Sequence, residues 1–119
     1  MSPARGVSAE RYRPDPAVVD RAVQAIVRAY RPQRVIVFGS FARGDTHELS
    51  DIDLIVVKET DERFFERIAR VRDACADLEV DVQPLVYTPA ELRQMLEQGN
   101  GFLETALAEG VVAYEAPAA

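Results

Sequence analysis

The sequence predicts an α+β fold, in which a small mixed β-sheet has helices packed against it. Two short apolar runs rich in β-branched residues lie in the first half of the chain, and a third run alternates apolar with polar residues. Segments with apolar residues at helical spacing lie before, between and after these runs. The 119 residues are enough for a single core, so we expect one domain.

The first helix and the domain limits follow from local patterns. Residues 1–13 are polar and without periodicity, so we expect a flexible arm, then a domain over 14–115 and a tail at 116–119. Pro16 follows a capping residue and suits the first position of a helix, and Pro32 marks the end of that helix's apolar stripe.

Two strands are predicted next, joined by a polar connection. The continuous apolar run Arg34–Phe38 is typical of a strand buried on both faces, and Ile52–Val57 is its counterpart. The connection is too short for a crossover helix, so we expect the two strands to be antiparallel neighbours. Between them the sequence predicts a Gly39-Ser40 break, a helical turn at Phe41–Arg43 and a loop at Gly44–Ser50.

The second half of the chain predicts three helices and two strands. We expect Thr60 to cap a helix, Glu79–Val86 to form the third strand, and Thr88 and Glu91 to form a capping box for the next helix. Asn100 is expected to cap a last short helix. The remaining predictions are that this helix buries Phe102, Ala106 and Leu107 and that an edge strand spans Val111–Tyr114.

Three arginines recur at helical spacing in the first of these helices. Arg63, Arg67 and Arg70 predict a basic stripe. Such a stripe is either a solvated face or a contact for an acidic partner.

The composition limits the environment and the partners. Apolar residues make up 48% of the chain, and no apolar run approaches the roughly 20 residues of a membrane span. The first residues lack the apolar stretch of a secretory signal, and Cys75 is the one cysteine, so we expect a reduced, cytoplasmic protein. A net charge of −6 argues against direct nucleic-acid binding, but bound metal ions would still allow a nucleotide ligand.

Gly39 and Ser40 form a candidate phosphate-binding turn. Glycine allows a backbone geometry that other residues resist, and it lets a phosphate approach the main chain. Ser40 adds a hydroxyl, and the following amides could point the same way at the start of a short helix. The alternative is an ordinary turn after a strand.

Asp51 and Asp53 are a candidate metal-binding pair. Two residues apart in a strand, their side chains leave the same face and repel each other unless a cation lies between them. Mg²⁺ commonly binds through one or two carboxylates and substrate phosphates. The alternative is a cap-like Asp51 and a solvated Asp53, but the apolar strand directly after Asp53 favours the metal-binding interpretation.

Asp81 is the candidate third carboxylate. It lies in the predicted third strand, so it could complete a set with Asp51 and Asp53 that holds two metal ions roughly 3.5–4 Å apart. A solvent-facing role is the alternative. Glu79 would point to the same face and is a rival for the same position.

The string GSFARGDTHELSDIDL resembles the nucleotidyltransferase superfamily, the polymerase beta-like enzymes. It is most similar to the minimal nucleotidyltransferases called MNT proteins, the antitoxin partners of HEPN toxins. The segments EVDVQPLVY and GFLETALAEGVVAYE are also in the style of that family, so the resemblance covers about 30–115. It implies the nucleotidyltransferase fold.

The resemblance also implies roles for particular residues. Gly39 and Ser40 would hold a triphosphate, and Arg43 would meet a phosphate oxygen, although a surface arginine that braces the loop is the alternative. The implied catalytic and metal-binding carboxylates, with two Mg²⁺ ions, are Asp51, Asp53 and Asp81.

These roles lead to a hypothesis of nucleotidyl transfer. An acceptor hydroxyl would attack the α-phosphate of ATP and pyrophosphate would leave, with Asp81 as a metal ligand or general base. Because the predicted domain takes up nearly all of the chain, we expect another protein to deliver the acceptor, which by resemblance is a tyrosine of a HEPN ribonuclease toxin.

Two alternatives stay open. The chain could be a non-catalytic antitoxin that acts by complex formation, or a nucleotidyltransferase acting on a small molecule with a partner subunit that completes the pocket. Assembly with itself or with a partner is compatible with each of these hypotheses.

Overall fold

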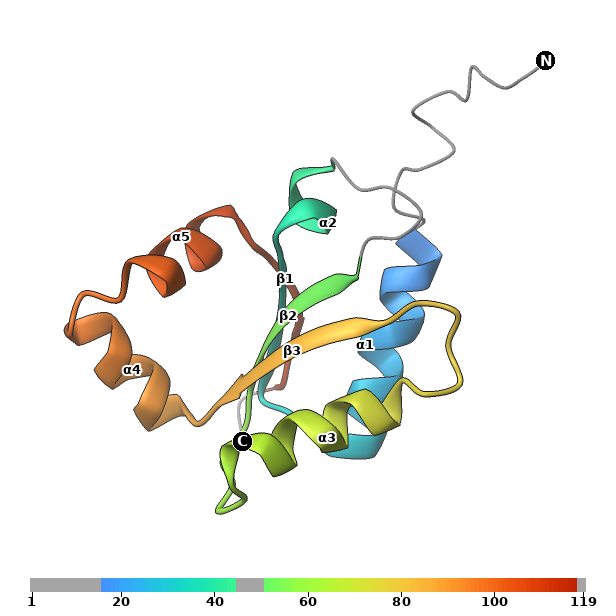
Figure 1. Cartoon of the computed structure of the whole chain (residues 1–119), viewed down its shortest axis with the longest axis horizontal. Helices are drawn as coiled ribbons and strands as arrows, with labels where there is room; N and C mark the ends of the chain where they lie inside the picture. Colours follow the sequence, from blue (N-terminus) through green and yellow to red (C-terminus); the bar gives the residue numbers. More distant parts are fainter. Residues whose placement is uncertain (1–15, 45–50, 118–119) are drawn as a thin grey trace.

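The computed structural model describes residues 16–44 and 51–117 and confirms the predicted α+β fold, a four-stranded mixed sheet with helices packed against it (Figure 1). The whole predicted arm, the loop residues 45–50 and the last two tail residues lie outside the described residues. The elements in chain order are α1 (Pro16–Tyr30), β1 (Arg34–Phe38), α2 (Ser40–Arg43), β2 (Ile52–Val57), α3 (Phe64–Ala74), β3 (Val82–Tyr87), α4 (Pro89–Glu97), α5 (Gly101–Glu109) and β4 (Val111–Glu115).

The sheet has the strand order β3-β2-β1-β4. β1 pairs antiparallel with β2, as the short connection predicted, and antiparallel with β4, whereas β2 pairs parallel with β3. Phe38 lies opposite Asp53, and Ile52 lies opposite Val82. The C-terminal end of β1 therefore lies beside the N-terminal ends of β2 and β3, and we call this edge the site end of the sheet.

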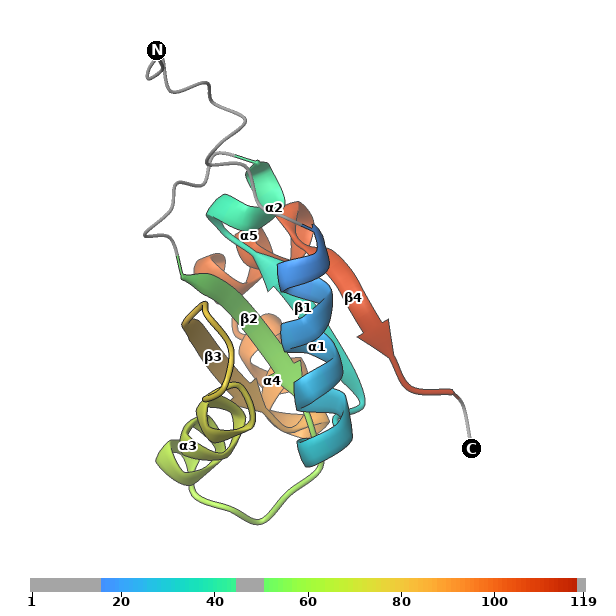
Figure 2. The same ribbon diagram turned by 90° about the vertical axis from the view of Figure 1, so that its right-hand side faces the viewer.

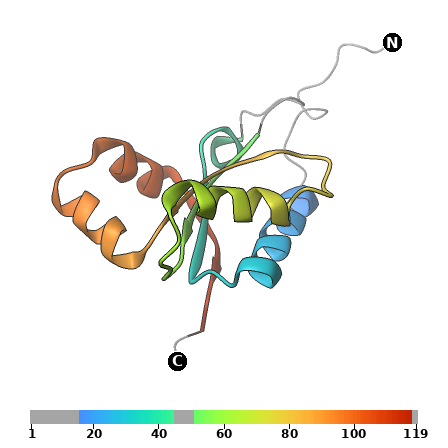
Figure 3. The ribbon, with the colours of Figure 1, turned by 60° about the horizontal axis from the view of Figure 1, so that its bottom comes forward.

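Two cores lie on opposite faces of the sheet. α1 and α3 cover one face, and α4 and α5 cover the other (Figures 1 and 3). Alternation along β2 supplies both cores, since Leu54 and Val56 pack on the first face and Ile55 and Val57 on the second. Burial on both faces confirms the prediction made from the continuous apolar run, and each such side chain contributes about 1.5–3 kcal/mol. None of the helices in the described ranges has the length and apolar character to cross a bilayer.

The predicted caps of α4 and α5 are confirmed. The Thr88 hydroxyl oxygen accepts a hydrogen bond from the Glu91 amide at 3.1 Å, and the Glu91 carboxylate accepts one from the Thr88 amide at 2.9 Å. The Asn100 side-chain oxygen accepts from the Leu103 amide at 3.0 Å. These interactions are local in sequence, and they fix where each helix begins.

The prediction that Phe102 is buried is wrong. Its side chain is 53% exposed, and Leu103 takes the buried position instead. The cap at Asn100 sets the phase of α5, so that Leu103 and Ala106, three residues apart, face the sheet. The Phe102 ring packs edge-on against Phe38, with 5.7 Å between ring centroids.

The predicted start of α3 at Thr60 is also wrong, because the helix begins at Phe64. The Thr60 hydroxyl oxygen accepts a hydrogen bond from the Glu62 amide at 3.0 Å, and the Glu62 carboxylate accepts one from the Tyr30 hydroxyl at 2.9 Å. This turn holds the chain out of the helix. Glu66 supplies the cap by accepting from the Arg63 amide at 2.8 Å.

The third strand begins at Val82 and ends at Tyr87, rather than spanning Glu79–Val86. Turns follow α3, with a backbone hydrogen bond from the Leu78 amide to the Cys75 carbonyl oxygen at 3.1 Å. Asp81 directly precedes the strand, and Glu79 lies in the bend before it. Glu79 and Asp81 therefore do not lie on one face of a strand, and the prediction that they do is wrong.

The predicted basic stripe does not exist, because Arg67 is buried. It is 7% exposed, and its guanidinium donates to Glu91 at 2.7 and 3.2 Å, to the Val86 carbonyl oxygen at 3.2 Å and to the Glu62 carbonyl oxygen at 2.8 Å. The hydrogen bonds from Arg67 hold the pKa of Glu91 below its usual value. One side chain thus joins α3, the end of β3 and the first turn of α4.

Replacing Arg67 with Met should lower the free energy of unfolding at pH 7 by at least about 2 kcal/mol. The loss should be less than the ~3–5 kcal/mol typical of a fully buried pair because Glu91 is half exposed. Arg67→Lys should recover part of the loss, since lysine replaces the charge but not the bidentate geometry. Denaturant titration measures the difference.

The stability lost on Arg67→Met should depend on pH. Since the folded-state pKa of Glu91 is depressed, the pair stabilises the fold above the usual carboxyl pKa and its contribution disappears as the pH falls through the folded-state value. The penalty of Arg67→Met should therefore shrink in acid. Exposed Arg93 on α4 provides the control, and an equal loss for Arg93→Met would contradict the account.

Candidate active site

The residues predicted for the site all belong to the site end of the sheet. β1 ends at Phe38, Gly39 makes the turn, and α2 follows directly (Figure 1). Asp53 is the second residue of β2 and lies opposite Phe38. Asp81 precedes the neighbouring strand β3. The sheet therefore brings segments far apart in sequence to one edge.

Gly39 allows the turn to lie against Asp53. Its φ is 71° and its ψ is −147°, a conformation that side-chain-bearing residues rarely adopt. A Cβ at this position would clash with the Asp53 carboxylate oxygen Oδ2 and would lie 3.2 Å from its Cγ. The absence of a side chain at Gly39 is thus required both by the backbone angle and by the carboxylate beside it.

Ser40 begins α2, one residue earlier than the predicted helical turn. The Arg43 amide donates to the Gly39 carbonyl oxygen at 3.0 Å, and the Gly44 amide donates to the Ser40 carbonyl oxygen at 2.8 Å. The amides of the first residues of a helix have no acceptors within it. This turn therefore presents main-chain donors next to the carboxylate of Asp53, an arrangement suited to the phosphates of a metal-bound nucleotide.

The carboxyl group of Asp53 has a raised pKa. It is half-buried, and burial is the main cause that raises its pKa above the usual value. The charge of Asp51 raises this pKa further, whereas Arg43 lowers it. Two carboxylates close enough to repel each other are therefore present at the site end, and a cation between them would relieve both the repulsion and the cost of burial.

Gln83 joins this group, although the sequence analysis did not select it. Its side-chain amide donates to Asp51 Oδ2 at 2.9 Å, and its backbone lies opposite Asp53. The Ile52 amide donates to the Asp81 carbonyl oxygen at 3.0 Å, so the parallel ladder reaches Asp81. Gln83 lies two residues after Asp81 in the sequence, and this spacing was the available signal for selecting it.

The described residues contain no group of three His, Cys, Asp or Glu side chains that could hold a metal ion. The structure thus brings Asp51 and Asp53 within electrostatic reach but does not gather Asp81 with them into such a group. The pair still suits Mg²⁺, since two carboxylates and substrate phosphates form a common magnesium site.

Arg43 lies at the edge of the site. Its guanidinium is 3.9 Å from the Glu109 carboxylate of α5, and both side chains are about half exposed. A pair of this length and exposure contributes little to stability. Arg43 also lowers the pKa of Asp53, so its charge lies near this carboxylate as well as near α5.

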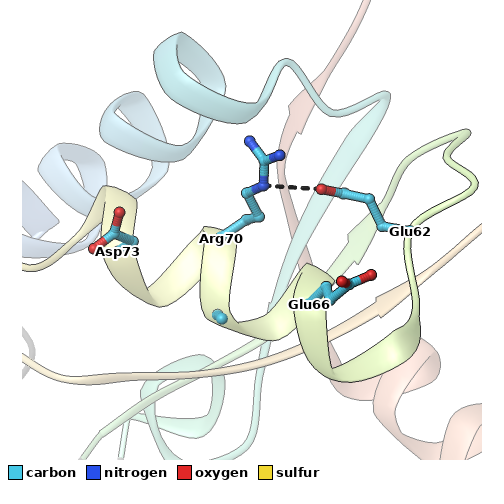
Figure 4. Close-up of a pocket in the computed structure, with 5 residues that line it drawn as sticks. Glu62, Glu66, Arg70 and Asp73 are labelled. Carbon is cyan, nitrogen blue, oxygen red and sulfur yellow. Dashed lines mark ion pairs between the residues drawn. The ribbon is translucent and has the colours of Figure 1, made fainter.

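A separate groove of about 470 Å³ lies on α3 (Figure 4). Arg70 forms an ion pair with Glu62 at 2.9 Å there, and Glu66 and Asp73 also line it. None of the residues predicted for the active site lines this groove. It is therefore distinct from the site end.

Comparison with solved structures shows that the fold is shared. A protein from Sulfolobus solfataricus assigned as a nucleotidyltransferase is 20% identical with a TM-score of 0.55, over 83% of this chain and 78% of that one. A chain of a toxin–antitoxin crystallised with AMP-PNP is 19% identical with a TM-score of 0.61, over 82% of this chain and 73% of that one.

Sequence comparison shows the family. No curated protein matches the sequence. The sequence model of the nucleotidyltransferase domain family matches residues 19–109. This range includes α1 from its fourth residue, the site end and both helices of the second core. The chain therefore belongs to the nucleotidyltransferase domain family.

Proposed function

We propose that the chain is an MNT-type antitoxin that transfers AMP from ATP to a tyrosine of a HEPN ribonuclease toxin. The observation that carries this proposal is the contact geometry between the Gly39 turn and Asp53, with Asp51 beside it. Similarity of the fold to a toxin–antitoxin crystallised with an ATP analogue supports the choice of nucleotide and of partner.

Each residue of the site has a role in this proposal. Gly39 and Ser40 bind the triphosphate through the main chain and the Ser40 hydroxyl, and Arg43 binds a phosphate oxygen. Asp51 and Asp53 would hold Mg²⁺, which would supply charge neutralisation and orientation for the triphosphate. Gln83 positions Asp51 through its hydrogen bond.

Asp81 acts as the general base. The tyrosine oxygen forms a bond to the α-phosphorus, and the bond from that phosphorus to the bridging oxygen breaks, so that pyrophosphate leaves. The hydroxyl proton passes to the Asp81 carboxylate. Asp81 is exposed and directly precedes β3 at the site end, so an acceptor can approach it from solvent.

The openness of the site favours a protein acceptor. Ser40 and Asp51 are half-buried and Asp81 is exposed, so the described side chains leave room at the site end. A small acceptor would need walls that exclude water and fix its orientation. A folded partner supplies both by covering the site when it binds.

Intact mass measurement tests the proposed reaction. The chain, a candidate HEPN partner encoded beside it, and Mg-ATP are incubated together, and the partner is weighed. We expect the mass to rise by one or more AMP units and the increase to disappear with Asp51→Asn plus Asp53→Asn. Asp77→Asn, an exposed residue after α3, should leave the increase unchanged.

The same experiment separates the alternatives. Neutralisation of the toxin that survives the double substitution, with no added mass, would mean that the chain acts by complex formation. With a low-molecular-weight cell extract added, AMP joined to a compound of the extract and an unmodified partner would instead indicate a small-molecule acceptor. Either result would contradict the proposal.

A double-mutant cycle tests whether Gly39 and Asp53 meet as described. Gly39→Ala should destabilise the protein through backbone strain and through the clash with Asp53. In an Asp53→Ala background the clash disappears, so the cost of Gly39→Ala should fall by about 1 kcal/mol or more. Gly44→Ala is the control, because its φ is 80° but an added Cβ meets nothing within 4 Å. Additivity of Gly39→Ala and Asp53→Ala would be evidence against the contact.

Asp53→Asn should stabilise the free protein at neutral pH. Since the folded-state pKa of Asp53 is raised, its ionised form destabilises the fold above that pKa, and the effect is absent below the usual pKa of 3.8. The midpoint of thermal unfolding should therefore be higher for Asp53→Asn at pH 7, and the two proteins should converge toward pH 4.

With Mg-ATP bound, the wild-type protein should have a higher unfolding midpoint than Asp53→Asn. Mg-ATP should raise the unfolding midpoint of the wild-type protein, because a ligand stabilises the state that binds it, and it should have little effect on Asp53→Asn. An equal rise for both proteins would mean that Asp53 does not take part in binding.

A further inference from the structure

The face formed by the outer side of α1 and the edge strand β4 is not used by the proposed reaction. α1 lies beside β4 (Figure 2), and a groove of about 440 Å³ separates them. Its lining includes three polar residues of α1 together with Ala113 and Tyr114 of β4. We call this the α1–β4 face, and the three polar residues are Asp20, Gln24 and Arg28.

The β4 part of this face exposes an apolar side chain at the edge of the sheet. β4 is the last strand in the sheet order, and its Val111, which is paired with Val37 of the first core and therefore lies on the α1 side, is 56% exposed. Exposed apolar residues on an edge strand are typical of contact surfaces. The pairing with β1 shifts register between Val35 and Ile36, so β4 is an irregular template for adding another strand. Side chains of the face therefore have to supply the specificity.

The α1 part of the face carries a self-complementary charge pattern. Asp20, Gln24 and Arg28 are four residues apart and so form one stripe along the helix. The two charged residues at its ends are separated by eight residues, or about 12 Å along the axis, too far to pair within the helix. When two copies of α1 lie antiparallel with Gln24 at the centre, each Asp20 lies opposite Arg28 of the partner subunit.

We propose that the α1–β4 face binds a second copy of this chain through a two-fold axis near Gln24 and Ala113. The charge pattern favours this occupant, because a two-fold contact needs one surface that complements itself. Both ion pairs form at once, and Ala113 and Tyr114 of the groove are covered in each copy. The carboxylates of the site end belong to β2 and to the residues directly before β2 and β3, so each copy keeps its own candidate site.

Charge exchange in solution tests the pairing. Sedimentation equilibrium over a concentration series should give a mass of twice the 13.2 kDa chain for the wild-type protein. Asp20→Arg places two arginines opposite each other across the contact, and Arg28→Asp places two aspartates together. Each should raise the dissociation constant by about tenfold or more.

The mixture of the two single variants is the decisive sample. One Asp20→Arg chain and one Arg28→Asp chain form two opposite-charge pairs, so the mixture should recover a dimer, as should the Asp20→Arg, Arg28→Asp double variant. Asp73→Arg on α3 is the control and should leave the dimer unchanged. Circular dichroism checks that every variant is folded.

Three results would overturn the proposal. They are a wild-type protein that stays monomeric over the whole series, a dimer unaffected by either single variant, and folded single variants that dissociate but do not recover when mixed. The first would leave the face to a different partner, and the other two would exclude the Asp20–Arg28 pairing.

Discussion

The antiparallel pairing of β1 with β2 is the constraint on which the candidate site depends. It places Phe38 opposite Asp53, so the residue after Phe38 must turn directly beside a carboxylate. Only a residue without a side chain can make that turn, because a Cβ at Gly39 would meet Asp53. The proximity of the Gly39 turn to Asp53 is therefore a consequence of one strand register, and a shift by one residue would move Asp53 to the other face.

The rest of the fold offsets the cost of this arrangement. Asp53 is half-buried beside a like charge, which destabilises the free protein. The two cores pack against β1 and β2 from both faces. Arg67 of α3 donates hydrogen bonds to the Val86 carbonyl oxygen near the end of β3 and to Glu91 of α4. A metal-bound nucleotide would relieve the repulsion at the site end, so its binding would be linked to stability through the same carboxylates.

Sequence patterns could predict the parts of this fold that depend on local chemistry. β1 and β2 have the predicted bounds because continuous apolar runs determine them, and the caps at Thr88 and Asn100 depend on neighbours within three residues. The predictions that were wrong depend on contacts between residues far apart in sequence. The start of α3 depends on a contact between Glu62 and Tyr30, far apart in sequence, and the burial of Arg67 depends on Glu91. The spacing of Asp51 and Asp53 was visible in the sequence, whereas the contact of Asp53 with the Gly39 turn and of Gln83 with Asp51 required the strand register.

The most direct test of the account is a crystal structure of the chain with Mn²⁺ and AMP-PNP, in which anomalous scattering locates the metal. We expect manganese bound to the carboxylates of Asp51 and Asp53, with the triphosphate against the main chain of Gly39 and Ser40. Metal and nucleotide bound away from the site end, or nucleotide bound without metal at these carboxylates, would contradict it.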